Sequence, residues 1–149
     1  LTTTSGTGLM YSTFERYGPK ATENLGERRN GVLISMAAGK TLAYPLFNLQ
    51  DRGRLFIGPS TAVYEGMVIG IHSRDNDLVV NPLKGKQLTN IRASGTDEAV
   101  VLSPPVRLTL EYALEFIDDD ELVEVTPKSI RVRKKHLREH DRKRASRAA

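Results

Sequence analysis

The stretch MVIGIHSRDNDLVVN, residues 67–81, indicates how this chain folds. Met67 to His72 is an apolar run of strand length, and Leu78 to Val80 is a shorter one. Between them, the sequence Arg74-Asp75-Asn76-Asp77 has the composition of a turn. The pattern therefore predicts two short strands separated by a tight connection.

Similar short apolar runs recur on both sides of this stretch. They are Val32–Met36, Arg54–Ile57, Ala62–Tyr64, Ala99–Leu102, Leu122–Val125 and Ile130–Arg133. Many short strands at close spacing are typical of a curled sheet. We expect an α+β fold that is strand-rich, with a barrel-like antiparallel sheet, a few short helices and a basic C-terminal helix.

Three segments are candidates for the helices. Leu42–Gln50 is ambiguous between strand and helix, because its apolar residues fit helical spacing and Pro45 fits a first turn. A second helix is expected to begin after an N-cap at Thr109. A third is expected over Lys134–Ala148, with almost no apolar face. The second helix has an apolar stripe formed by Leu110, Leu114 and Ile117.

A long polar segment, NPLKGKQLTNIRASGTDEAVVL (Asn81–Leu102), separates two apolar runs. Lys84, Lys86 and Arg92 give it positive charge, and glycines let its backbone approach a partner closely. Loops of this length in compact domains are usually functional or disordered. It is therefore a candidate contact surface, and the alternative is a solvated excursion without a partner.

The positive charge of the chain is concentrated at one end. Residues 128–149 contain 10 Lys/Arg and 2 Asp/Glu, whereas residues 1–127 contain 12 Lys/Arg and 16 Asp/Glu. In the run Arg131-Val132-Arg133-Lys134-Lys135, strand alternation places Arg131, Arg133 and Lys135 on one face. A basic end on an acidic body favours a polyanionic partner, with nucleic acid preferred over a membrane surface.

The composition also limits the function classes. The chain of 149 residues is long enough for about one domain. It has no Cys, which excludes disulfides and cysteine zinc sites and fits a cytoplasmic protein. The sequence contains no run of 18 apolar residues, which is the length that a membrane-spanning helix needs. The chain does not begin with Met, and we expect a piece of a larger protein, with a strand over Met10–Phe14 and a linker over Tyr17–Asn30.

Four motifs suggest chemistry only weakly. Gly39-Lys40-Thr41 lacks the earlier glycine of a P-loop, and a turn between strands is the simpler interpretation. His136-Leu137-Arg138-Glu139-His140 matches a zinc-peptidase pattern, but surrounding cations would repel the metal. Asp118–Glu121 offers ligands for a hard cation without the layout of a calcium loop, and a solvated turn is the simpler interpretation. Because anions are disfavoured at the end of a helix, pairing of this run with the basic end is a further suggestion. His72 ends an apolar run and is interpreted as structural.

Four longer stretches carry a resemblance to a known family. They are FNLQDRGRLFIG (Phe47–Gly58), VYEGMVIGIHSRDNDLVVN (Val63–Asn81), KGKQLTNIRASGTDEAVVL (Lys84–Leu102) and LEFIDDDELVEVTPKSIRVRKKHL (Leu114–Leu137). In this order they resemble the C-terminal region of the TypA/BipA family. These are ribosome-associated translational GTPases related to elongation factor G. The start of the chain, with SGTGLM and GERRNGVLIS, resembles the end of the family's fifth domain.

The resemblance implies a domain organisation and a set of RNA contacts. Residues 1–30 would be a remnant of the fifth domain plus a linker, and residues 31–149 the family-specific C-terminal domain. The loop would reach into the large ribosomal subunit near the acceptor end of an A-site tRNA. Its RNA-facing residues would be Lys84, Lys86, Asn90, Arg92 and Ser94. A second basic surface for ribosomal RNA would comprise Arg131, Arg133, Lys134, Lys135 and Arg138.

The resemblance also implies what this chain does not do. GTP hydrolysis, with GTP and magnesium as cofactors, would belong to an N-terminal domain outside this sequence. We therefore expect a monomeric, cytoplasmic, non-enzymatic module that binds the ribosome, holds no cofactor or metal and does not bind membranes. The alternative from a different class is a protein-interaction module whose basic C-terminal end binds an acidic protein.

Overall fold

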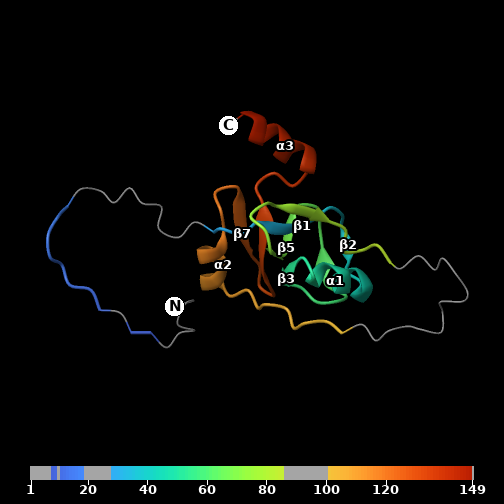
Figure 1. Cartoon of the computed structure of the whole chain (residues 1–149), viewed down its shortest axis with the longest axis horizontal. Coiled ribbons are helices and arrows are strands. Elements are labelled where there is room, and N and C mark those ends of the chain that lie inside the picture. Colours follow the sequence, from blue (N-terminus) through green and yellow to red (C-terminus); the bar gives the residue numbers. More distant parts are fainter. Residues whose placement is uncertain (1–7, 10, 19–27, 86–100, 149) are drawn as a thin grey trace, which may run out of the picture.

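The computed structural model describes residues 8–9, 11–18, 28–85 and 101–148, and its main feature is one mixed sheet (Figure 1). The strands of this sheet are β1 (Val32–Ser35), β3 (Gly53–Leu55), β5 (Met67–His72), β6 (Leu78–Val80), β7 (Glu121–Val125) and β8 (Ile130–Lys134). A small second sheet pairs β2 (Gly39–Lys40) with β4 (Ala62–Val63). The helices are α1 (Ala43–Gln50), α2 (Leu110–Phe116) and α3 (Glu139–Ala148).

Strand β5 is the centre of the sheet. It pairs antiparallel with β1 along one edge, and with β8 and β3 along its two halves. Both edges of β5 are therefore occupied. The next strand in the chain, β6, pairs instead with β1, and this pair is parallel. The order β6-β1-β5-β8-β7 leaves β6 and β7 as edge strands. The strand-rich α+β class is thus confirmed, but the described strands do not close, and a barrel-like antiparallel sheet is not confirmed.

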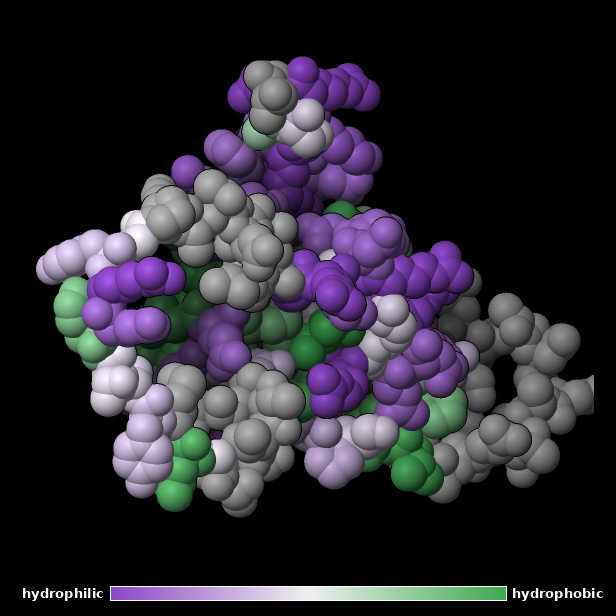
Figure 2. Space-filling model, turned by 60° about the vertical axis from the view of Figure 1, so that its left-hand side comes forward, coloured by the Kyte–Doolittle hydropathy of each residue, from purple (hydrophilic) through white to green (hydrophobic). Residues whose placement is uncertain are grey.

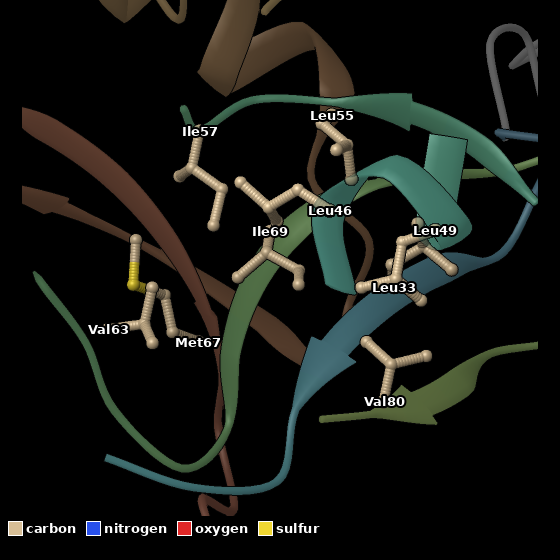
Figure 3. Packing of buried hydrophobic residues seen from close by; sticks show 9 residues of the cluster. All are labelled: Leu33, Leu46, Leu49, Leu55, Ile57, Val63, Met67, Ile69 and Val80. Atoms are coloured by element: carbon tan, nitrogen blue, oxygen red, sulfur yellow. The ribbon is translucent and has the colours of Figure 1, made fainter. Parts of the chain in front are cut away.

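Alternation along the strands divides the apolar side chains between the two faces of the sheet. On one face, Leu33 and Ile69 belong to a cluster with Leu46 and Leu49 of α1 (Figure 3). On the other face, Val68 and Val132 pack with Ala113 and Phe116 of α2. The sheet therefore carries one helix on each face, as the two-residue period of a strand buried on both sides requires.

The structure resolves the ambiguous segment as helix α1. Pro45 lies within its first turn, where a missing N–H costs no hydrogen bond. Pro45, Leu46 and Leu49 are buried, and the helix ends with a cap at Asp51, before Gly53 begins β3. Of the ambiguous segment Leu42–Gln50, all but the N-cap residue Leu42 is therefore helical.

Helix α2 begins where the sequence predicts but buries a different face. The Thr109 hydroxyl accepts a hydrogen bond of 3.2 Å from the Tyr112 amide, which confirms the N-cap. The predicted apolar stripe is wrong for Leu110 and Leu114, which are 39% and 58% exposed, whereas Ile117 packs against the core. The buried residues of the helix are Ala113 and Phe116. The aromatic ring decides the packing: Phe116 meets Phe56 edge to face with centroids 5.3 Å apart.

Two further expectations concern the N-terminal part and membranes. Residues 11–14, expected to form a strand, have no strand conformation, and Tyr11 and Phe14 are exposed. Met10 lies outside the described residues. Within the described part of the chain, no helix has the length and apolar character needed to cross a bilayer.

Candidate nucleic-acid interface

Helix α1 holds both ends of the long polar loop. At its start, the Leu42 amide donates to the carbonyl oxygen of Pro82 at 3.1 Å. At its end, the Gln50 side chain donates to the Val101 carbonyl and accepts from the Ser103 amide, both at 3.1 Å. The eight-residue helix is about 12 Å long, and the loop is held near both of its ends. Figure 1 shows α1 beside the two described ends of this loop.

Local interactions fix the departing segment further. The Asn81 side chain accepts a hydrogen bond of 2.9 Å from the Leu83 amide, which forms a turn closed by the side chain. Pro82 is fully buried, and Leu83 packs against the α1 face of the core. From the returning side, Leu102 packs against the same cluster. We call this arrangement, residues 81–85 and 101–103 with α1, the loop base.

A cavity of about 650 Å³ opens beside the loop base, between α1 and strand β6. We call it the loop-base cavity. Its lining residues are Tyr44, Pro45, Asn48, Leu49, Arg52, Leu78, Val79, Val80, Asn81, Lys84 and Gly85. This lining contains two cations and no carboxylate, although the body of the chain is net acidic.

Of the five loop residues predicted to face RNA, one falls within the described part. Lys84 is exposed, lines the loop-base cavity and has no ion pair with a described residue. The other four, Lys86, Asn90, Arg92 and Ser94, lie outside the described residues.

Strand β8 separates its basic residues by face, as alternation predicts. Val132 and Lys134 are buried, whereas Arg131 and Arg133 are half-buried and Lys135, just past the strand, is exposed. The face that carries the two arginines is not uniformly basic. Glu124 lies opposite Arg131 in the register and accepts a hydrogen bond of 2.6 Å from the Tyr64 hydroxyl. Burial and this bond to Glu124 raise the pKa of Tyr64 well above its ordinary value.

Lys134 does not belong to the exposed basic surface, and the structure corrects its predicted role in binding RNA. Its side chain is only 2% exposed, because it points to the same face as Val132. Its Nζ atom lies 2.6 Å from Asp77 and 2.9 Å from both Asp120 and Glu121. A cation held this way by three carboxylates is not available to a phosphate.

The pKa of Lys134 reflects this environment. Burial by itself would lower it, but hydrogen bonds to Asp77, Asp120 and Glu121 outweigh burial and raise the pKa above its ordinary value. The acidic run after α2 therefore serves Lys134 at the end of the basic strand. The predicted pairing with the basic end is thus confirmed for Asp120 and Glu121 of this run.

Arg28 completes this cluster, and sequence analysis did not single it out. Its guanidinium forms two parallel bonds to the buried carboxylate of Glu121, at 2.7 and 2.8 Å. It also lies 4.6 Å from the centre of the Phe116 ring and 3.8 Å from Asp118. Burial opposes its charge, yet the bonds to Glu121 raise the pKa of Arg28. We call the set Arg28, Asp77, Asp118, Asp120, Glu121 and Lys134 the ion cluster.

The basic C-terminal helix begins later than predicted. Helix α3 starts at Glu139, because Lys134 ends β8 and the segment 135–138 turns away from the sheet. Leu137 of this segment packs against Gly66, whose φ of 85° and lack of a side chain permit the contact. Arg142 donates to the carbonyl oxygens of His136 and Leu137 and ties the helix to the segment.

Helix α3 carries most of its charge on the surface. Figure 2 shows hydrophilic residues gathered at the top of the molecule, where α3 lies. Two ion pairs within the helix, Lys143 with Glu139 and Arg144 with Asp141, neutralise part of this charge. Arg138 is exposed in the segment before the helix.

The four weak motifs are explained by structural contacts or lack the arrangement that their proposed chemistry needs. Thr41 of the P-loop-like sequence is buried and bonds Gly58 and Thr61. His136 lies outside α3, so the two histidines of the zinc-peptidase pattern do not share a helical face. His72 is buried, and its Nδ1 contacts the carbonyl oxygen of Asn76. Among the described residues, no group of three acidic or histidine side chains is arranged to hold a metal ion.

Comparison with known proteins gives the family. The family model described as the TypA/BipA C-terminal domain matches residues 30–139, which is most of the chain. The chain belongs to this family. Three similar proteins, each named large ribosomal subunit assembly factor BipA, are 68% identical in Escherichia coli K12, 65% in Salmonella typhimurium and 63% in Haemophilus influenzae. Each alignment covers 99% of this chain but 24% of the relative, so the chain spans about a quarter of these TypA/BipA proteins.

Proposed function

We propose that this chain is the ribosome-binding module of a large ribosomal subunit assembly factor and acts by docking on RNA. The loop base carries the proposal. It holds both ends of a long polar loop and places Lys84 and Arg52 at a cavity whose described lining residues include no carboxylate. The name shared by its relatives supports the ribosome as the partner.

In this proposal, phosphate contacts provide position and the loop reads local RNA shape. Lys84, Lys86 and Arg92 would meet phosphates, and Asn90 and Ser94 would offer an amide and a hydroxyl to exposed bases. The RNA would be large-subunit ribosomal RNA together with the acceptor end of an A-site tRNA. The second basic surface would comprise Arg131, Arg133, Lys135 and Arg138, without Lys134, because its charge is already compensated.

The module itself would carry no chemical step. GTP hydrolysis, with its magnesium ion, would belong to the part of the whole protein beyond this chain. Residues 1–30 would connect to the preceding domain, and residues 31–149 would act as one monomeric cytoplasmic unit. Affinity for the ribosome would then combine contributions from several linked domains.

Co-sedimentation with ribosomes across a salt series tests this function. We expect salt-sensitive binding by the chain, and a weaker binding with a flatter salt dependence when Lys84, Lys86 and Arg92 are all replaced by Ala. Removing one cation that binds a phosphate should flatten the logarithmic slope by about 0.7 to 0.9. A triple Ala variant of Arg29, Arg54 and Arg107, which are exposed and do not line the loop-base cavity, is the matched control. Equal slopes for both variants would contradict the role of the loop.

A second candidate function is binding of an acidic protein through the basic C-terminal end. It is favoured by the position of α3, which projects away from the sheet and exposes its cations (Figure 1). Treatment with ribonuclease separates the two functions. Loss of the partner after treatment supports RNA docking, whereas retention supports the acidic protein.

A further inference from the structure

The loop-base cavity combines features that recognise one kind of ligand. Its volume of about 650 Å³ is in the range of small-molecule sites. Leu49, Leu78 and Val80 give it apolar walls, and Asn48 and Asn81 bring side-chain amides to it. Arg52 and Lys84 bring the positive charge. Such a site offers an apolar surface, hydrogen-bonding groups and cations together.

One face of α1 presents three of these groups in a row. Tyr44, Asn48 and Arg52 are spaced four residues apart, so they follow one another along a single side of the helix and its end. All three are exposed, and Tyr44 has 38% of its surface accessible. The row extends about 12 Å, which matches one or two nucleotides of an extended strand.

The described residues provide no compensation for the cations of the cavity. Neither Arg52 nor Lys84 forms an ion pair with a described side chain, and the described residues that line the cavity include no carboxylate. Asn48 makes no side-chain hydrogen bond to another described residue. Within the described part of the chain, the donors of these three side chains are therefore not used by other side chains. Phosphate satisfies such cations, and the edge of a nucleobase satisfies an amide.

We propose that the loop-base cavity binds an unpaired nucleotide of single-stranded RNA. The base stacks on Tyr44 and bonds the amide of Asn48, while Arg52 and Lys84 hold the flanking phosphates. A duplex does not fit this arrangement, because its bases are stacked on each other and not on a protein ring. The proposal rests on the proposed RNA-binding function and adds a nucleotide site to it.

Fluorescence anisotropy with a labelled oligouridine, and with an RNA duplex of the same length, tests the site. We expect the chain to prefer the single strand. Tyr44→Ala should weaken that binding about tenfold, since stacking on an aromatic ring contributes on this scale. Tyr44→Phe keeps the ring and should retain affinity. Arg52→Gln should flatten the salt slope by about 0.7, whereas Arg54→Gln, outside the cavity, should not.

Two outcomes would overturn the nucleotide site. One is equal affinity of Tyr44→Ala and the unmodified chain for oligouridine, which would mean that the cavity binds phosphates without recognising a base. The other is absence of oligouridine binding at low salt. Thermal unfolding of each variant verifies its fold, since the exposed Tyr44 ring is not part of the core. Ribosome co-sedimentation of the unmodified chain is scored separately, so loss of the nucleotide site and loss of ribosome docking give different results.

Discussion

Two pairs of cations in this domain have opposite surroundings. Arg28 and Lys134 are enclosed in the ion cluster, with four carboxylates around them. Arg52 and Lys84 line the loop-base cavity, whose lining, as far as the structure describes the chain, contains no carboxylate. The residue types are the same, so the position of the carboxylates decides the role. The first pair stabilises the fold, and in the proposed function the second pair contacts RNA.

The energetics of burial explain the difference. A buried charge without a partner costs several kcal/mol, so Lys134 has to be surrounded by acceptors if it is to remain charged. An exposed cation stays hydrated and needs no partner. Substitution of the exposed Arg52 or Lys84 should therefore change the stability of the fold very little.

The largest effect is expected from breaking the ion cluster at its centre. Lys134→Ala leaves Asp77, Asp120 and Glu121 without their shared cation, and we expect a loss of about 3–5 kcal/mol in the free energy of unfolding. Urea denaturation followed by circular dichroism measures this loss. Lys135→Ala, the next residue and exposed, is the control. Similar stability of the two variants would show that the cluster contributes nothing beyond surface charge.

Strongly alkaline pH should weaken the same region more gradually. The pKa of Lys134 is raised above 10.5, so its contribution is complete below that pH and is lost as pH rises through the folded value. The raised pKa of Tyr64 acts in the same direction, because the phenol ionises first in the unfolded chain, near pH 10. Stability should be constant near neutrality and fall above about pH 10. Denaturation at a series of pH values measures this.

Tyr64→Phe separates the two contributions to the alkaline loss. The variant removes the titrating phenol but leaves Lys134 and its three carboxylates in place. In this variant we expect the alkaline fall in stability to begin at higher pH. The part of the fall that comes from Lys134 should still be observed. A rise in stability of the unmodified chain between pH 10 and 11 would contradict the direction given for both groups.

The strand pattern can be predicted from sequence because it depends on local alternation. The structure confirms both Met67–His72 and Leu78–Val80 as strands with these bounds. Their partners could not be predicted from local pattern. Strand β6 pairs with β1 and not with β5, because β1 occupies one edge of β5 and β8 and β3 occupy the other. The parallel pair and the open sheet follow from this competition between strands distant in sequence.

The site shows the same division between local and distant information. Alternation correctly separates Arg131 and Arg133 from the buried face, and it equally implies that Lys134 points inward. Its carboxylate partners at residues 77, 120 and 121 could not be identified from spacing. Arg28 gives no signal at all, because a basic residue in a polar segment is ordinary until Glu121 and Phe116 are next to it. The sequence offers one sign of the ion cluster: alternation turns Lys134 inward, and a buried Lys needs carboxylates such as those of the acidic run after α2.

The smallest effect is expected from an ion pair that is shorter than those of the ion cluster. Lys143 and Glu139 lie 2.5 Å apart on α3, with side chains 67% and 42% exposed. Nearby Lys143 lowers the pKa of Glu139, but water already solvates both charges and salt screens them. Glu139→Gln should therefore leave the midpoint of urea unfolding where it is in the unmodified chain. A shift as large as that of Lys134→Ala would mean that distance, and not burial, determines the contribution of ion pairs in this domain.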